Sequence, residues 1–131
     1  MTSEQYAEMV RVLVMDVRNT GVRDAAESPQ LEYAFSVLAR RSGDRCLGVG
    51  RDNYERDDGT QAFEDRDLLE ILEDCREEAL DVPAYLTQVD HRLSILTDSA
   101  AVDPDVAEGV VLAARLLLVL DRLEMRVGEM E

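Results

Sequence analysis

The chain contains no lysine, no tryptophan and only one histidine, and it has just two cysteines, Cys46 and Cys75. Thiols this sparse indicate a reducing compartment, because small secreted domains depend on many paired cysteines. No apolar stretch near the N-terminus resembles a signal peptide. The most apolar run, residues 110–120, is too short to cross a bilayer and is interrupted by Arg115. These absences predict a cytoplasmic protein that does not enter a membrane.

Negative charge is what the chain has in excess. Its 29 acidic and 14 basic residues give a formal net charge of −15 and an isoelectric point near 4.3. This charge excludes DNA, RNA and anionic membranes as general partners, but it leaves divalent cations, basic protein surfaces and nucleotide–metal complexes open. Hydrophobic residues occupy 46% of the 131 positions. That is enough for one folded domain over residues 1–131 without disulfide or metal staples.

All of the basic residues are arginine, which reflects either GC-rich coding or the recognition of phosphate and carboxylate groups. Four of them lie in a stretch that contains several glycines: Arg40, Arg41, Arg45 and Arg51. Guanidinium groups and free backbone amides bind phosphates, so these four are candidate phosphate-binding residues. Acidic residues are interleaved with them, and a salt-bridged surface loop is the alternative. A phosphate-binding fingerprint such as GxxxxGKS/T is not found here.

The first helix is expected to begin near Thr2, where the side chains of Thr2 and Gln5 have the spacing of a capping box. It should run to about residue 19, with Gly21 as its end. Its apolar residues recur at helical spacing. The expected inner face consists of Tyr6, Val10, Leu13 and Val17.

A second helix is expected to begin at Ser28-Pro29, because serine caps free amides and proline is well tolerated at the first helical position. We expect Gly43 to end it. Residues 42–65 then lose the helical pattern and predict a long irregular loop of the kind that is often functional. The expected inner face of the second helix consists of Leu31, Ala34, Phe35 and Leu38.

A third helix should begin near Asp65 and continue past Pro83, where the loss of a backbone hydrogen bond predicts a kink or a break. Asp103-Pro104 repeats the cap-and-proline pattern and opens a fourth helix that runs to about Gly128. The middle of this fourth helix is apolar nearly all round and needs cover on several sides. The sequence therefore predicts an all-α, four-helix-type bundle that forms a homodimer through the fourth helix and part of the third.

The stretch from Arg66 to Val89 combines an apolar stripe with a ladder of carboxylates on one predicted helix. The apolar residues recur at steps of four and three, the period of a helix buried along one side: Leu68, Leu72, Cys75, Ala79, Val82, Leu86, Val89, Leu93 and Leu96. About half a turn away, the same rhythm is followed by Glu70, Asp74, Glu77 and Asp81. These acids form either a solvated face or a metal site that a second helix or a partner subunit covers.

Part of this stretch resembles known proteins. Residues 77–86, with the pattern EExxDxxxYL, look like the second half of the motif of the MazG-like all-α nucleoside triphosphate pyrophosphohydrolases. The wider span of residues 54–89 contains GTQAF, RDLL, EEALD and YL. In this respect it is similar to small uncharacterised proteins of actinobacteria and their phages. The resemblance covers about a quarter of the chain, and its motif is moderately specific.

The resemblance implies a metal site and an activity. By analogy with the family's ExxD helix, Glu78 and Asp81 would bind Mg²⁺, with Glu77 beside them and Asp74 one turn earlier. The metal would bridge the phosphates of a nucleotide ligand and activate a water for attack on a pyrophosphate bond. Tyr85 would stack on the base. The family also uses an ExxE pair on a separate preceding helix, and this chain has none.

Simpler explanations exist for the remaining candidates. His91 is either a general base or an exposed helix residue. Cys75 is a small core residue, since no base that would activate a thiolate stands near it in the sequence. Tyr85 is alternatively a bundle residue with its hydroxyl at the edge.

The competing function follows from net charge. In this alternative, the protein is a non-enzymatic, phage-encoded interaction or inhibitor protein whose negative surface binds a basic protein partner.

Overall fold

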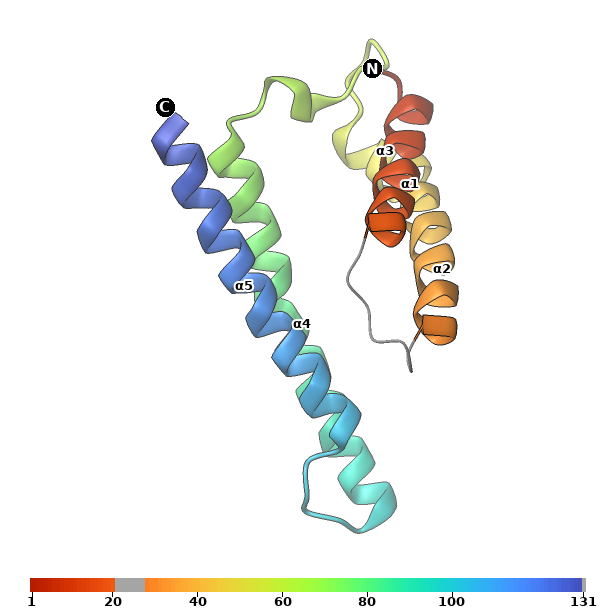
Figure 1. Cartoon of the computed structure of the whole chain (residues 1–131), viewed down its shortest axis with the longest axis vertical. Coiled ribbons are helices and arrows are strands. Elements are labelled where there is room, and N and C mark those ends of the chain that lie inside the picture. The colour runs from red at the N-terminus through yellow and green to blue at the C-terminus, as the bar shows by residue number, and fades with distance from the viewer. Residues whose placement is uncertain (21–27, 131) are drawn as a thin grey trace. The chain divides into compact units, whose positions relative to one another are not determined.

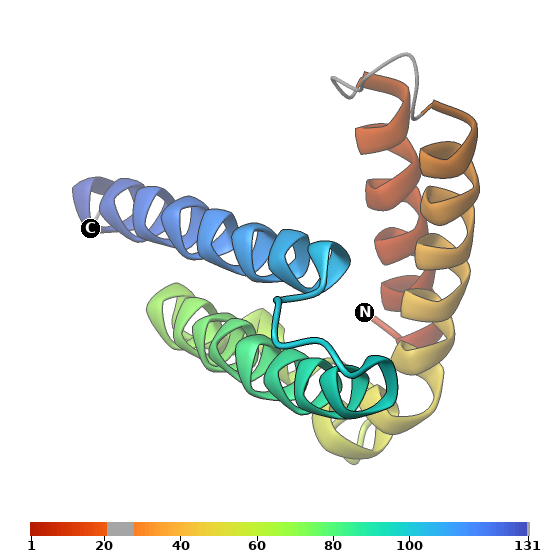
Figure 2. The same cartoon turned by 90° about the horizontal axis from the view of Figure 1, so that it is seen from below.

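The computed structural model describes residues 1–20 and 28–130, and within them the chain is all-α. It contains five α-helices and one short 3₁₀ helix: α1 (Ser3–Thr20), α2 (Ser28–Leu47), α3 (Val49–Tyr54), η1 (Ala62–Asp65), α4 (Leu68–Thr97) and α5 (Pro104–Met130). The chain divides into two compact units, Met1–Asp65 and Arg66–Glu131. Each unit is built on a pair of long helices that lie side by side (Figures 1 and 2). The all-α prediction is confirmed, whereas a single four-helix bundle remains a prediction.

The N-terminal unit begins with the capping box that the sequence predicts. The Thr2 amide donates to Gln5 Oε1 at 2.8 Å, and the Gln5 amide donates to Thr2 Oγ1 at 3.1 Å. Each side chain thus satisfies one amide that the first helical turn leaves without a partner. Gly21, the expected end of α1, lies outside the described residues.

Gly43 does not end the second helix, contrary to the prediction. It lies buried inside α2, which continues to Leu47. A Cβ at this position would lie 2.4 Å from Nε of Arg11 on α1, so the glycine permits close approach of the two helices. The irregular loop predicted for residues 42–65 is correspondingly shorter, because α2, α3 and η1 occupy much of it.

The inner face predicted for α1 is only partly correct. Leu13 and Val17 are exposed, at 63% and 48%, whereas Ala7 is fully buried. The least exposed side chains of α1 include Ser3 and Ala7, which are buried, and Val10 and Val14, which are partly buried. On α2, Leu31 and Phe35 are partly buried, while Ala34 and Leu38 are exposed.

The C-terminal unit is an antiparallel pair formed by α4 and α5 (Figure 1). Both helices begin at aspartate caps: Asp67 accepts from the Leu69 amide at 2.8 Å, and Asp103 accepts from the Asp105 amide at 2.9 Å. The predicted start of the last helix is therefore confirmed. The helix α4 continues across Pro83 as one element, so a break there is excluded and a kink stays a prediction.

The contact between α4 and α5 follows a row that we call the seam. On α4, the least exposed side chains recur at steps of four and three: Leu72, Arg76, Ala79, Pro83, Leu86, Asp90 and Leu93. On α5, the corresponding row contains Val106, Gly109, Ala113, Leu117, Leu120, Leu123 and Val127. This spacing is that of a coiled-coil contact. A Cβ at Gly109 would lie 2.8 Å from Leu86 Cδ1, so these two residues mark where the helices approach closely.

Only every second residue of the apolar stripe predicted for α4 lies in the contact with α5. Leu72, Ala79, Leu86 and Leu93 lie on the seam, whereas the alternate members are exposed: Leu68, Cys75, Val82, Val89 and Leu96. Two helices in contact bury only a narrow row on each. The broader stripe therefore has one flank uncovered. In the described part of the chain, no helix combines the length and apolarity needed to cross a membrane.

Candidate functional site

The carboxylates predicted as metal ligands lie on the surface of α4. Glu77, Glu78 and Asp81 are all exposed, and none of them forms an ion pair with a described residue. Because they project from a single turn and a half of helix, they can attract a cation together. Within this chain, however, α5 does not cover them.

Asp74, the fourth predicted metal ligand, is engaged by an arginine. Nη1 of Arg66 lies 2.7 Å from Asp74 Oδ2, and Nε of Arg66 lies 4.0 Å from Glu70 Oε2. Among the described residues, no three side chains of histidine, cysteine, aspartate or glutamate are grouped to hold a metal ion. The Mg²⁺ site therefore stays a prediction that requires ligands from another molecule.

The four candidate phosphate-binding arginines belong to two helices. Arg40, Arg41 and Arg45 are exposed on α2, and Arg51 lies on α3. Arg51 Nη2 donates to Glu4 Oε1 at 2.5 Å, and its Nε lies 3.4 Å from Glu55 Oε2. The ion pairs of Arg51 agree with the salt-bridge alternative. Phosphate binding by the other three stays a prediction.

Tyr85, His91 and Cys75 all lie on the exposed surface of α4. Tyr85 is 67% exposed, so its ring does not pack within the helical pair; base stacking stays a prediction. The expectation that Cys75 is a core residue is wrong for this pair of helices. The next residue, Arg76, lies on the seam, and the thiol of Cys75 is therefore exposed beside it.

Arg76 joins the two helices of the C-terminal unit, a role that sequence reasoning missed. Its Nη1 donates to Asp121 at 2.8 Å and its Nη2 donates to Glu124 at 2.7 Å, while Glu73 lies 3.7 Å from Nε. The hydrogen bond with Asp121 is the main cause that raises the pKa of Arg76 above its ordinary value. An arginine within an apolar row is the signal that could have revealed it.

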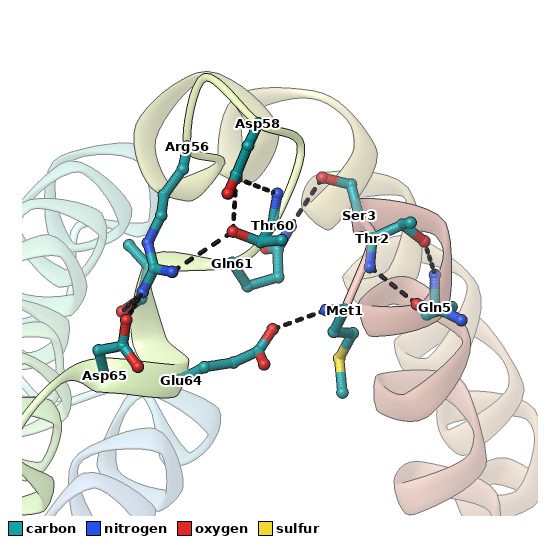
Figure 3. A network of polar contacts seen from close by, with 11 residues as sticks. Met1, Thr2, Ser3, Gln5, Arg56, Asp58, Thr60, Gln61, Glu64 and Asp65 are labelled. Atoms are coloured by element: carbon teal, nitrogen blue, oxygen red, sulfur yellow. Dashed lines mark hydrogen bonds and ion pairs between the residues drawn. The ribbon is translucent and has the colours of Figure 1, made fainter.

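A buried polar contact in the N-terminal unit was also missed. Ser3 and Gln61 are each 1% exposed, and Gln61 Nε2 donates to Ser3 Oγ at 2.9 Å (Figure 3). The Ser3 hydroxyl in turn donates to the Glu55 carboxylate. Buried polar groups require such partners. These hydrogen bonds therefore connect the start of α1 to the segment that follows α3.

The same segment is ordered by a set of exposed polar contacts. Arg56 Nη2 donates to Asp65 Oδ2 at 2.5 Å, and Thr60 donates to Asp58 through both its amide and its hydroxyl. The hydroxyl hydrogen bond is the main cause that lowers the pKa of Asp58. The N-terminal ammonium of Met1 lies 3.0 Å from Glu64 Oε1 (Figure 3). These contacts order the segment that follows α3.

The strongest candidate for function is therefore the acidic face of α4, which consists of Glu70, Glu73, Asp74, Glu77, Glu78 and Asp81. All six side chains are exposed, and exposed carboxylates recognise cationic groups through long-range attraction and charge-assisted hydrogen bonds. No known protein family, curated protein or solved structure matches the chain.

Proposed function

We propose that this protein is a non-enzymatic interaction protein that binds a basic protein surface through the acidic face of α4. The observation that carries the proposal is the exposure of six carboxylates within twelve residues of one helix. Only two described arginines, Arg66 and Arg76, form ion pairs with them. The face keeps a negative surplus, and a rigid helix presents it at fixed spacing.

Electrostatics of this kind favours a protein partner over a nucleic acid. The chain carries a formal net charge of −15, which repels phosphate backbones and attracts clustered arginine or lysine side chains. Charges at the rim of an interface mainly accelerate association and give specificity. Binding should therefore weaken steeply as salt screens the attraction.

The first test removes charge from the acidic face without touching Glu78 or Asp81. We expect Glu73→Gln with Glu77→Gln to weaken binding of a fluorescent deca-arginine peptide about tenfold at low salt, since each lost carboxylate removes part of the attraction. The measurement is fluorescence anisotropy over a series of salt concentrations. The matched control is Glu108→Gln with Glu129→Gln, which removes the same charge from exposed positions on α5.

If both double variants weaken the peptide equally, net charge alone drives binding and the acidic face is not the site. Binding that does not change with salt would also contradict the proposal, because attraction between exposed charges is screened at about 10 Å in 0.1 M salt.

A second candidate function is that of a MazG-like, nucleotide-directed protein that binds a phosphorylated ligand with Mg²⁺. The observation that favours it is the pair Glu78 and Asp81. They stand three residues apart on one helix, and neither forms an ion pair with a described residue. Carboxylates at this spacing can share one hard cation, and phosphate oxygens and water would complete its coordination. The cation would then polarise the phosphate for attack by water.

Calorimetric titration with ATP in the presence of Mg²⁺ tests this candidate. We expect Glu78→Gln and Asp81→Asn each to remove at least nine tenths of the Mg²⁺-dependent affinity, because a hard cation loses an oxygen ligand and a compensating charge. Glu108→Gln is the control on α5 and should leave binding unchanged. The candidate is refuted if the titration heat is the same in all four proteins, or if the wild-type protein releases or absorbs none.

A further inference from the structure

One flank of the α4–α5 pair is apolar and uncovered, and we call it the open apolar face. On α4, Cys75, Val82 and Val89 each stand one residue before a seam position and are exposed. On α5, Leu116 has the same relation to Leu117 and is 39% exposed. The face consists of Cys75, Val82, Val89 and Leu96 on α4 with Leu112, Leu116 and Val119 on α5.

These two rows lie on the same side of the pair. When antiparallel helices share a heptad seam, positions that precede the seam on one helix adjoin the equivalent positions on the other. The opposite flank carries the ion pairs of Arg76 with Glu73, Asp121 and Glu124. One flank of the pair therefore carries these ion pairs, and the other carries the apolar rows, with Glu78 and Glu108 also one residue before a seam position.

The open apolar face is longer on α4 than on α5. Its row on α4 runs from Cys75 to Leu96, about 32 Å of helix, whereas its row on α5 runs from Leu112 to Val119, about 11 Å. At about 10 Å of width for each helix, the two rows together cover roughly 400 Å². An exposed apolar patch of this extent is often functional.

Charges along the outer edges of the two helices indicate what covers this face. The edge of α4 bears Glu70, Asp74 and Asp81, and the edge of α5 bears Arg115, Arg122 and Arg126. Asp81 stands two residues beyond the seam residue Ala79, and Arg115 stands two residues beyond Ala113. Each of these two side chains is therefore rotated about 200° around its helix axis from the seam. The three arginines are exposed, and none forms an ion pair with a described residue.

These edge charges stand at matching heights. The hydrogen bond between Arg76 and Asp121 shows that these two residues lie at the same height along the helical pair. The helices are antiparallel, so Asp74, which is two residues before Arg76, is level with Arg122, which is one residue after Asp121. Because Leu86 approaches Gly109, Asp81 and Arg115 are level by the same reasoning. Glu70 and Arg126 form a third such pair. Within one chain, the two members of each pair lie on opposite edges and cannot meet.

We propose that a second copy of this chain covers the open apolar face, with α4 of each copy lying over α5 of the other. A two-fold axis parallel to the helices produces this arrangement and keeps every residue at its height. Asp81 of one copy then lies beside Arg115 of the other, and Asp74 lies beside Arg122. The apolar rows of the two copies fill the centre of a four-helix bundle, whose neighbouring helices are all antiparallel.

The charges also decide between the two symmetric ways of stacking the faces. If α4 lay over α4, the acidic edges of both copies would adjoin, and so would the arginine edges of α5. Like charges at an interface disfavour association. The proposed arrangement instead places each of the three acidic residues beside an arginine of the other copy. Asp81 and Arg115 form the pair in which neither member has an ion pair with a described residue of its own chain, because Arg66 already contacts Asp74 and Glu70. Glu70, Asp74 and Asp81 also belong to the acidic face, so in this dimer a basic partner would contact that face through Glu73 and Glu77, which are directed away from the open apolar face.

Sedimentation velocity of the full chain over a range of concentrations tests the dimer and its register. We expect the wild-type protein to dimerise, and Asp81→Arg or Arg115→Asp each to weaken the dimer about tenfold, since either change creates two like-charged pairs. An equimolar mixture of the two variants should recover wild-type affinity as a heterodimer, because every pair is again opposite in charge. Both positions are exposed, and circular dichroism verifies that each variant is folded.

Alkylation of Cys75 gives a second readout. The thiol is exposed in the single chain, and in the dimer it lies within the covered face. We expect its reaction with iodoacetamide to slow as protein concentration rises, when mass spectrometry follows each cysteine separately. Cys46 is the internal control: burial raises the pKa of its thiol, which makes it slow at every concentration.

Three results would overturn the proposal. A monomer with a reactive Cys75 at all concentrations means that the face stays open. A monomer whose Cys75 is protected at all concentrations means that the face is covered by the unit Met1–Asp65 of the same chain. A dimer that is insensitive to both charge reversals, or that is not restored by mixing them, excludes the proposed register.

Discussion

Replacing Leu120 by alanine is expected to lower the free energy of unfolding by about 2–4 kcal/mol, the range found when a leucine is truncated in a packed core. Leu120 is 3% exposed and lies on the seam of α5, in line with Ala113 and Val106. The lost side chain leaves a cavity between the two helices, because the surrounding structure relaxes only partly. Urea unfolding followed by circular dichroism measures the change, at one protein concentration because any association stabilises the folded state.

The matched control is Leu118→Ala on the same helix. Leu118 is 58% exposed and lies off both the seam and the open apolar face, so the same truncation should cost less than about 0.5 kcal/mol. Equal losses at the two positions would mean that α5 does not pack on α4 through the face that contains Leu120.

Local signals allowed the helix starts to be predicted. The Thr2–Gln5 capping box and the Asp103 cap each depend on residues within three positions of one another. Such hydrogen bonds form wherever the helix forms, whatever packs against it. This is why the sequence identified these boundaries correctly.

The rotation of each helix about its axis could not be predicted in the same way. On α4, the apolar stripe is wide enough to be divided between the seam and the open apolar face, and periodicity alone does not say which row α5 covers. In the structure, the row that α5 covers is the one that contains Arg76, whose ion pairs with Asp121 and Glu124 join the two helices. Gly43 differs from its predicted role for a related reason: a glycine permits close packing of helices as readily as it ends a helix.

The acidic residues of the candidate site were identified from sequence, but their surroundings were not. The spacing of Glu77, Glu78 and Asp81 correctly places them on one helix and predicts their shared side. Their exposure depends on the course of α5 and on whatever else meets α4, and residue spacing carries no information about either.

The buried hydrogen bond between Ser3 and Gln61 could not be predicted from local sequence patterns, because 58 positions separate the two residues. We expect Ser3→Ala to lower the free energy of unfolding by about 1–3 kcal/mol, because a buried donor on Gln61 would lose its partner and the Glu55 carboxylate would lose one of its hydrogen bonds. Gln61→Ala should have an effect of similar size, since its side chain is also fully enclosed. Urea unfolding of each variant measures these losses.

A double-mutant cycle separates the hydrogen bond from the effects of truncation. If the Gln61 amide and the Ser3 hydroxyl stabilise the fold together, the double variant should lose at least about 0.5 kcal/mol less than the sum of the two single losses. Gln88→Ala, on the exposed surface of α4, is the control for removing a glutamine side chain and should change stability by less than about 0.5 kcal/mol. Strict additivity would mean that the two residues act separately. In that case, this hydrogen bond would not be what joins the start of α1 to the segment after α3.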